Sequence, residues 1–298
     1  MQLRFLEYFV ALAEERHFAG AARRCSVTQP TLSSGVSSLE RLLGKRLVLR
    51  DRRFIDLTPE GEAVLGHARQ IIAQAALLRQ AIDAAGPLRG VLRLGVIPAA
   101  MPRLGGYLGA LHMAHPELGI AIRQRTSAEI LEGLAAYEVD AGLLYADVGL
   151  GPHLEQVPLY EERFQLAVPA ASASDGPVTL ADVVAQPLCL LHEGMMNRRI
   201  FDRHLAAQGL EARPVATADS YIALLSLVSG AGLAAVVTDS HARFASADAG
   251  IRFLPIADIA EPNVVTLVAS GREPVSPIAR AALAAAASLN MIDCVYQP

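Results

Sequence analysis

The sequence predicts an α + α/β fold in three parts: a small helical N-terminal head, one long linker helix, and a larger α/β unit made of two lobes. Three observations support this prediction. Residues 1–58 contain short amphipathic helices followed by two strand-like runs, apolar residues recur at alternating spacings of four and three from residue 59, and apolar strands alternate with helical segments from residue 88. At 298 residues, 52% of them hydrophobic, the chain is long enough to fill the cores of all three parts.

Residues 18–44 have the pattern of two helices joined by a tight turn. The Thr28 hydroxyl can cap the second helix, Pro30 fits its first turn, and Gly44 ends it. Apolar residues at three- and four-residue spacing give this helix one buried face, made of Leu32, Val36, Leu39 and Leu43. The opposite face is polar near its start, as a helix that reads a DNA groove requires. The sequence therefore predicts a helix-turn-helix whose DNA contacts come from Thr28, Gln29, Pro30, Thr31, Ser33, Ser34 and Ser37.

Gly35 lies inside this second helix. A glycine there destabilises a helix by about 1 kcal/mol relative to alanine. Two interpretations stay open: Gly35 allows a close approach to DNA, or it is merely tolerated.

A charged turn lies between two apolar runs in residues 45–58, which predicts a two-stranded wing. Arg50, Arg52 and Arg53 at its tip are expected to contact phosphates. Residues 1–58 hold ten basic and six acidic residues, whereas the rest of the chain holds 16 basic and 24 acidic ones. The overall charge of −4 thus conceals a basic head that would attract the DNA backbone in a salt-dependent way.

A long helix with a repeating apolar seam is predicted for residues 59–87. Its spacing is the heptad pattern of a helix that packs against a partner helix. The seam consists of Val64, Ala68, Ile71, Ala75, Leu78, Ile82 and Ala85. At roughly 1.5 Å per residue the helix would be about 40 Å long, which would separate the head from a second domain. Because three of the seam residues are alanines, the alternative that this helix lies on its own domain stays open.

Strands and helices alternate from residue 88 onward. The first set has strands at 91–97, 118–125 and 141–144 and helices at 102–115 and 127–137. The second has strands at 166–168, 188–191, 214–216 and 233–237 and helices at 197–207 and 220–228. A strand at 264–269 and an alanine-rich helix at 277–288 follow. This pattern predicts parallel sheets in two α/β lobes with a cleft between them.

Segments spread over residues 1–61 resemble a known family. They are residues 5–11, 21–22, 28–33, 39–40, 43–44 and 57–61. In these segments the chain resembles the winged helix-turn-helix of LysR-type transcriptional regulators, and its length and order of parts are similar too. The resemblance implies a winged helix-turn-helix DNA-binding domain at 1–58, a linker and dimerisation helix at 59–87, and an effector-binding regulatory domain at 88–298 like a type 2 periplasmic binding protein. The family commonly has Arg-Gln where this chain has Ser34-Gly35, and a hydroxyl residue in place of Ala19, so its base contacts are not carried over there.

In the family's regulatory domain the chain crosses twice between the lobes. Here the crossings are expected near Tyr160–Phe164 and Asn263–Leu267. Lobe I would then comprise about 88–161 and 266–298, and lobe II about 162–265. The resemblance further implies a homodimer or homotetramer on paired half-sites of double-stranded DNA, a small-molecule effector in the cleft, and RNA polymerase as a further partner. Effector binding would shift the lobes and change the spacing or bend of the DNA heads.

Loops at the carboxyl ends of the predicted strands line the expected cleft. Helix N-termini there offer backbone donors and a positive dipole end, which favours an anion such as a small carboxylate as effector. The candidate effector-binding residues are Ala100, Met101, Thr126, Ser127, His192, Asn197, Arg198, Ser220, Tyr221 and Thr238. Thr126, Ser127, Asn197 and Ser220 have an alternative interpretation as helix caps only. Arg198 could clamp a carboxylate through two hydrogen bonds or be a solvated surface arginine.

Two short segments suggest the class of signal. Residues 126–130 and 196–200 resemble segments of LysR-type regulators found beside formate dehydrogenase genes. This narrower resemblance implies formate or a related small acid as the effector.

Other chemistry is not indicated. His112 and His115 have helical spacing but no apparent third ligand, so no metal site is predicted. Cys25, Cys189 and Cys294 are expected to be buried thiols in a reducing cytosol, with a Cys189–Cys294 redox switch as the alternative. No catalytic motif, phosphate-binding loop, dinucleotide fingerprint, membrane span or secretory signal is apparent, so the sequence predicts a cytoplasmic protein that is not an enzyme and needs no cofactor. Two competing classes are a small-acid-binding module whose head does not read DNA, and an enzyme built on the two-lobed fold.

Overall fold

The computed structural model describes residues 2–50, 54–82, 86–146, 150–172, 176–244, 250–271 and 275–289. The chain divides into two units, Met1–Pro87 with Gly133–Val139, and Leu88–Glu132 with Asp140–Pro298. Each has its own set of buried apolar side chains. Among the described residues, no helix combines the length and apolar character needed to cross a membrane.

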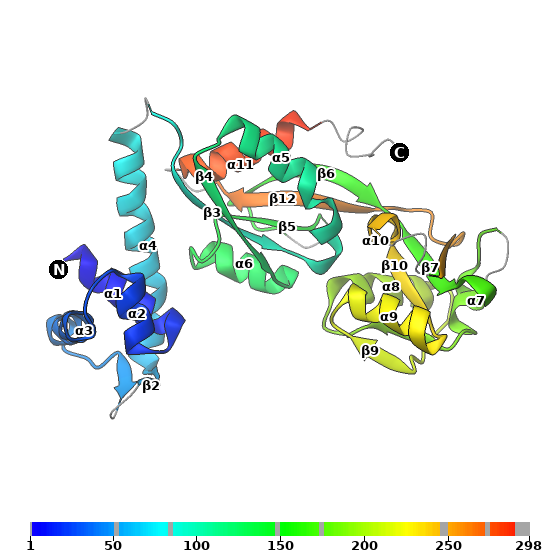
Figure 1. The fold of residues 1–298 in the computed structure, drawn as a ribbon, viewed down its shortest axis with the longest axis horizontal. Coiled ribbons are helices and arrows are strands. Elements are labelled where there is room, and N and C mark those ends of the chain that lie inside the picture. The colour runs from blue at the N-terminus through cyan, green and yellow to red at the C-terminus, as the bar shows by residue number, and fades with distance from the viewer. Residues whose placement is uncertain are drawn as a thin grey trace. The chain divides into compact units, whose positions relative to one another are not determined.

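Helices and a two-stranded wing make up the head of the first unit (Figure 1). The elements are α1 (Leu3–Glu15), α2 (Phe18–Arg24), α3 (Gln29–Leu43), β1 (Val48–Arg50), β2 (Phe54–Leu57) and the long α4 (Pro59–Ile82). Ser26 adopts a left-handed φ of 54° in the turn between α2 and α3. The ends predicted for α3 are confirmed, because Thr28 caps it and Gly44 ends it with a φ of 67°.

The core of the head lies between α1 and α3. Its central side chains are at most 2% exposed: Leu6, Phe9 and Leu12 from α1, and Leu32, Val36 and Leu39 from α3. Leu43 was expected to extend this buried stripe but is 42% exposed, because it lies in the last turn of α3, past the packed core.

Hydrogen bonds fix the wing to the helices on either side of it. The Glu40 carboxylate of α3 accepts from the Leu47 N–H at 3.0 Å. At the start of α4, the Thr58 hydroxyl donates to the Arg46 carbonyl at 2.7 Å and accepts from the Gly61 N–H at 2.9 Å. The wing therefore has one polar anchor on α3 and another at the start of α4.

The apolar seam of α4 serves two purposes. Val64 and Ala68 pack on the head core, together with Leu65 and Ile72. Ile71 and Leu78 are 41% and 66% exposed. The side chain of Ile82 and the whole of Ala85 lie outside the described residues. The part of the predicted seam formed by Val64 and Ala68 thus packs on the head of the same chain, as the alternative interpretation holds. The part formed by Ile71 and Leu78 is exposed to solvent.

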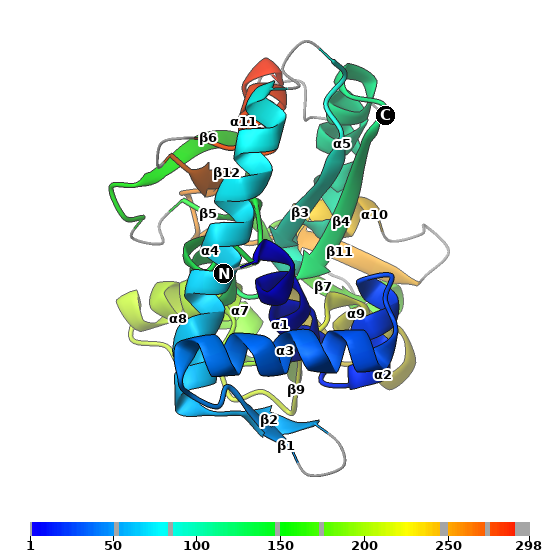
Figure 2. The same cartoon turned by 90° about the vertical axis from the view of Figure 1, so that its left-hand side faces the viewer.

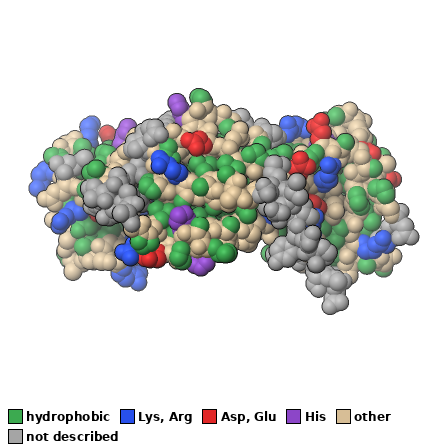
Figure 3. All heavy atoms as spheres, turned by 90° about the horizontal axis from the view of Figure 1, so that it is seen from above, with side chains coloured by type: hydrophobic (Ala, Val, Ile, Leu, Met, Phe, Trp, Pro, Cys, Tyr) green, Lys and Arg blue, Asp and Glu red, His purple; other side chains and the backbone are tan. Residues whose placement is uncertain are grey.

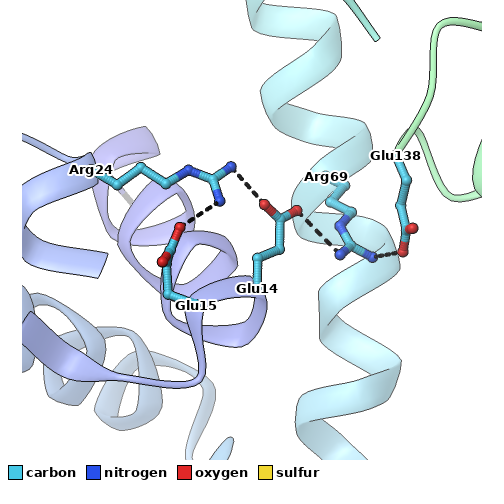
Figure 4. Close-up of polar contacts among 5 residues, drawn as sticks. All are labelled: Glu14, Glu15, Arg24, Arg69 and Glu138. Carbon is cyan, nitrogen blue, oxygen red and sulfur yellow. Dashed lines mark hydrogen bonds and ion pairs between the residues drawn. The ribbon is translucent and has the colours of Figure 1, made fainter. Parts of the chain in front are cut away.

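Ion pairs connect the helices of the first unit (Figure 4). Arg24 of α2 contacts Glu14 and Glu15 of α1. Arg69 of α4 reaches Glu14 at 3.2 Å, and its other terminal nitrogen donates to Glu138 at 2.6 Å. The Arg24 pairs lie on a solvated surface, where a single ion pair contributes little to stability. The Arg69 side chain is only 12% exposed and is held between two carboxylates.

The first lobe of the larger unit contains the sheet β4-β3-β5-β12-β6. Its elements are β3 (Gly90–Val96), η1 (Pro98–Arg103), α5 (Leu104–Ala114), β4 (Leu118–Gln124), α6 (Ser127–Ala135), β5 (Ala141–Tyr145), β6 (Leu154–Glu162), β12 (Asn263–Ser270) and α11 (Pro277–Ser288). Val96 of β3 pairs with Gln124 of β4 and Leu143 of β5, so these parallel strands end at one edge.

The second lobe contains the sheet β11-β7-β10-β8-β9. Its elements are β7 (Phe164–Pro169), η2 (Ala170–Ser172), α7 (Leu180–Val184), β8 (Leu188–Leu191), α8 (Met196–Ala207), β9 (Ala216–Ala218), α9 (Tyr221–Ala231), β10 (Ala234–Thr238), α10 (Asp239–Phe244) and β11 (Ile251–Pro255). β8 is parallel to β9 and β10.

The sheets differ from the expected parallel ones, because each is mixed. In lobe I, β12 runs antiparallel to β5 and β6, and in lobe II, β7 runs antiparallel to β10 and β11. The antiparallel strands are the ones that lead into or out of the two lobe crossings. One crossing lies at Arg163, between β6 and β7, as expected. The other lies between β11 and β12, ahead of the expected Asn263–Leu267, since Asn263 already pairs with Glu162 in the lobe I sheet.

Candidate functional site

The start of α3 presents polar side chains to solvent. Thr28, Gln29, Pro30, Thr31 and Ser34 are exposed, and Ser33 and Ser37 are half-buried. The Thr28 hydroxyl accepts from the Thr31 N–H at 3.4 Å, and the Ser37 hydroxyl donates to the Ser33 carbonyl at 2.9 Å. Figure 2 shows α3 along the surface of the head, with the β1–β2 wing beside it. The side chain of Arg50 and all of Arg52 and Arg53 lie outside the described residues.

Gly35 faces the head core, so neither sequence interpretation explains it. It is buried. A Cβ at this position would lie 2.5 Å from Cδ2 of Tyr8 and 3.2 Å from Cδ1 of Phe5. Gly35 is therefore required by close packing of α3 on α1, and it does not present a surface to DNA.

Gly35→Ala is expected to destabilise the head by about 1–3 kcal/mol, because the new methyl group overlaps the Tyr8 ring. Thermal unfolding followed by circular dichroism measures this. The matched control is Ser34→Ala at the exposed neighbouring position, which should stay within about 0.5 kcal/mol of the original protein. Equal melting temperatures for both variants would contradict the packing role.

Two adjoining cavities lie between the lobes of the larger unit. The outer one has a volume of about 380 Å³ and the inner one about 20 Å³. Pro98, Thr126 and Met195 line both. The outer cavity adds Gln124, Arg125, Glu129, His192, Gly194 and Asp219. The inner one adds Ile97, Ala99, Tyr145, Leu191, Met196, Asn197 and Tyr221, and it has room for one water-sized group.

The starts of three helices lie at the walls of these cavities. Neither α8 nor α9 has a side-chain cap at its N-terminus, and residues from both first turns line the inner cavity. The start of α6 is capped: Glu129 accepts from the Thr126 N–H at 2.7 Å, and its own N–H donates to the Thr126 hydroxyl at 3.3 Å. Thr126 and Glu129 thus form a capping box, which confirms the interpretation of Thr126 as a helix cap. The hydrogen bonds from Thr126 lower the pKa of Glu129, so the cavity wall carries a carboxylate beside Arg125.

The structure brings four of the ten predicted effector residues to the cavity walls: Thr126, His192, Asn197 and Tyr221. Ser127 is buried beside them, and its hydroxyl has no hydrogen-bond partner in the described part of the chain. Ala100, Met101 and Ser220 are absent from the two linings, although their neighbours Ala99 and Tyr221 are present.

Arg198 and Thr238 are engaged inside lobe II. Arg198 is 6% exposed, pairs with Asp202 at 2.8 Å, and donates to the Leu191 carbonyl at 3.0 Å. It is thus neither a ligand clamp nor a solvated arginine. The Thr238 hydroxyl is paired with Nδ1 of His241 at 3.0 Å. Burial lowers the pKa of His241 to about 4, so this imidazole is neutral.

Tyr145, Gln124 and Met195 line the cavities but were not predicted. In the sequence, Tyr145 directly follows the apolar strand predicted at 141–144. Its position at the carboxyl end of β5, next to the expected crevice, is the signal that could have identified it.

A buried polar cluster adjoins the inner cavity. The Tyr145 hydroxyl donates to Oε1 of Glu162 and accepts from Nδ2 of Asn197. The Ser240 hydroxyl donates to Oε2 of Glu162 at 3.2 Å and accepts from Nε of Arg103 at 2.9 Å. Burial is the main cause that raises the pKa of Glu162 to about 8. The hydrogen bonds of this cluster thus connect lobe I, through Arg103, Tyr145 and Glu162, to Asn197 and Ser240 of lobe II.

Metal and thiol chemistry have little support in the described parts of the chain. No group of three metal-ligating side chains occurs there. Cys189 is fully buried, and burial raises its pKa to about 11, which keeps the thiol protonated at neutral pH. Cys294, the other member of the alternative Cys189–Cys294 switch, lies outside the described residues.

Comparisons with known proteins match both parts of the chain. Residues 3–62 match the bacterial regulatory helix-turn-helix protein, lysR family, and residues 85–289 match the LysR substrate binding domain. A protein of Streptomyces viridosporus named "Probable hydrogen peroxide-inducible genes activator" is 34% identical over 232 residues, which cover 76% of this chain and 73% of that protein. A full-length OxyR variant from Pseudomonas aeruginosa superposes with a TM-score of 0.79 at 25% identity, over 100% of this chain and 99% of that one. Full-length CbnR in complex with its target DNA gives a TM-score of 0.72 at 26% identity, over 97% and 100% of the two chains.

Proposed function

The chain belongs to the LysR family of transcriptional regulators, and we propose that it binds paired DNA half-sites as a homodimer or homotetramer and responds to a small anionic metabolite held between its two lobes. As a family member it is a DNA-binding transcription regulator with an effector-binding domain. The relatives named above are regulators rather than enzymes, in agreement with the sequence analysis.

Exposed polar side chains at the start of α3 support direct contact with DNA bases. Gln29 and Ser34 are solvent-exposed beside a helix face that is fully buried in the head. A polar first turn on a rigid helix suits insertion into the major groove. CbnR, which has the same fold, was solved with its target DNA bound.

Exposed apolar side chains support self-association. Ile71 and Leu78 of α4 are open, and on lobe I Val91, Met113 and Ile122 are exposed. Figure 3 shows hydrophobic side chains gathered over the face of lobe I that carries α5 and α11. A second copy of the chain would remove this apolar surface from water.

The observation that supports an anionic effector is a buried, unsatisfied donor on the cavity wall. Among the residues that the structure describes, the buried Tyr221 hydroxyl has no hydrogen-bond partner, and Tyr221 lines the inner cavity. The uncapped starts of α8 and α9 add backbone donors. Because a buried donor without a partner is costly, an oxygen of a small carboxylate in the inner cavity would satisfy it.

The relatives' names raise peroxide as a competing signal. Cys189 argues against it, because a buried thiol with a raised pKa is a poor nucleophile. We therefore propose formate or a related small acid rather than an oxidant.

A nuclease footprint of the purified protein on the DNA upstream of its own gene tests this proposal. Formate, acetate and oxalate at millimolar concentration form one arm, and hydrogen peroxide forms the other. Protection of a two-part site whose extent changes with a carboxylate is the expected result. A change with peroxide alone would show that the effector is an oxidant rather than a small acid. No protection at low salt would contradict the proposed DNA binding.

Gln29→Ala or Ser33→Ala is expected to weaken operator binding by 1–3 kcal/mol, roughly, and to relax its specificity. Arg52→Ala or Arg53→Ala should weaken binding to all DNA and lower the salt slope by about one unit each. Gln70→Ala, at an exposed position on α4, serves as the matched control for Gln29→Ala and should leave affinity unchanged. Unaltered operator affinity in all four variants would overturn the assignment of the head.

A further inference from the structure

Glu162 is buried at the point where the chain passes from one lobe to the other. It is the last residue of β6, and its side chain has no exposed surface. One carboxyl oxygen accepts from Tyr145 on β5 of lobe I, and the other accepts from Ser240 on α10 of lobe II. A carboxyl group held from both lobes can therefore respond to changes in either.

A chain of two hydrogen bonds connects Glu162 to the inner cavity. Asn197 donates to the Tyr145 oxygen, and Tyr145 donates to Glu162. Tyr145 and Asn197 line the inner cavity together with Tyr221, whose buried hydroxyl has no hydrogen-bond partner among the described residues. Tyr145 thus contacts the buried Glu162 carboxyl group and also lines the inner cavity, where the effector is proposed to bind.

Counting protons shows that Tyr145 cannot serve both sides when Glu162 is ionised. The phenol has one proton and two lone pairs. Its proton goes to the Glu162 carboxylate, and one lone pair accepts from Asn197, so no donor remains for the cavity. When Glu162 is protonated, its O–H can donate to the second lone pair of Tyr145. The Tyr145 proton is then free to turn toward an acceptor in the cavity.

We propose that anion binding in the cavity is linked to a proton on Glu162, which reverses the Tyr145–Glu162 hydrogen bond and directs the Tyr145 hydroxyl at the effector. The proton comes from solvent. It offsets the negative charge that the effector brings to a buried site, where two uncompensated anions would repel each other. This inference rests on the proposed function, since it requires an anionic effector between the lobes.

The charged groups around Glu162 fit this role. Asp239 of α10 raises its pKa, and Arg103 of η1 lowers it. The Arg103 guanidinium lies 4.7 Å from the centre of the Tyr160 ring, and one of its nitrogens lies 3.6 Å from a carboxylate oxygen of Asp239. Its positive charge therefore interacts with these two groups as well as with Glu162. Tyr145 on β5 and Tyr221 on α9 have pKa values raised by burial and stay neutral, and His241 on α10 is neutral too. With burial, the balance gives the carboxyl a pKa of about 8.

Linkage fixes the direction of the pH dependence. An anion beside Tyr145 favours protonated Glu162, so the bound state holds the proton to higher pH than the free state. Affinity for the carboxylate should be level below pH 7 and fall by up to about tenfold per pH unit above pH 8. At pH 8.5, binding should take up about three quarters of a proton, given a free-state pKa near 8.

Isothermal titration calorimetry of the full-length protein with formate, acetate and oxalate tests the linkage. Titrations at pH 8.5 in Tris and in EPPS, which differ in ionisation enthalpy, give the proton uptake directly. Glu162→Gln keeps a neutral donor beside Tyr145, so its affinity should become independent of pH and its proton uptake should vanish. Glu161→Gln, the exposed neighbour on β6, should behave like the original protein.

Infrared spectroscopy supplies a readout without ligand. The carbonyl band of a protonated carboxylic acid should be present at pH 7, disappear by pH 10, and be missing in Glu162→Gln. Absence of that band at pH 7 in the original protein would overturn the proposal. So would carboxylate binding with equal heats in the two buffers, which would leave the proposed effector class standing. Failure of all three carboxylates to bind would overturn both.

Discussion

Gly61→Ala is expected to destabilise the head by about 3 kcal/mol or more and to abolish operator binding. Gly61 lies in the first turn of α4, where a Cβ would be 2.1 Å from the Leu47 carbonyl oxygen. That oxygen is backbone and already accepts from the Thr58 N–H at 3.0 Å, so it cannot swing aside as a flexible side chain would. The new methyl group must separate the wing from α4, which strains the backbone and the hydrogen bonds of Thr58.

A second glycine of the same helix is the control for Gly61→Ala. A Cβ at Gly66 would meet nothing within 4 Å. Gly66→Ala should therefore stabilise α4 by up to about 1 kcal/mol through helix propensity alone. Thermal unfolding and operator binding of both variants give the comparison. Similar melting temperatures for the two would show that the contact with Leu47 does not restrict residue 61.

The stability of the larger unit is expected to fall as pH rises from 5 to 8, because of Glu162. Its pKa is about 8 in the folded protein, against 4.5 for an unperturbed glutamate. The folded state therefore keeps a proton that the unfolded chain loses. The stabilisation from this group is fully present below pH 4.5 and is lost as pH rises through 8. The slope from one proton is about 1.4 kcal/mol per pH unit at most.

Glu162→Gln should remove this slope and make the protein more stable than the original above pH 8. Urea unfolding of the full chain at several pH values, followed by tyrosine fluorescence, measures it. Glu161→Gln should retain the slope of the original protein. Parallel slopes for Glu162→Gln and the original would mean that the buried carboxyl does not hold its proton.

Local sequence signals predicted the parts of the fold that depend on neighbouring residues. The Thr28 cap and the Gly44 stop predicted the limits of α3 because capping acts within one helical turn. The capping box at Thr126 and Glu129 was predictable for the same reason. The strands β6 and β11 were missed: β6 is mostly polar on its open face, and β11 contains a charged residue and ends in proline.

Contacts between distant residues could not be predicted in this way. Gly35 is explained by Tyr8, which is brought near only by the packing of α1 on α3. Arg198 looked free for a ligand because its contact with the Leu191 carbonyl depends on the path of the chain before α8. Glu162 gave no signal in sequence, since its neighbour Glu161 is the same residue type and is exposed. Its properties come from partners on β5 and α10.

The division of α3 into a buried face and an exposed face has a consequence for how such regulators diverge. Leu32, Val36 and Leu39 hold the helix in place, while Gln29, Thr31 and Ser34 project into solvent and contribute nothing to the core. Changes at the exposed positions therefore leave folding intact. Under the proposed function, in which that face reads the DNA bases, a duplicated copy of this chain acquires new target promoters through a few point mutations there, with no compensating change elsewhere in the head.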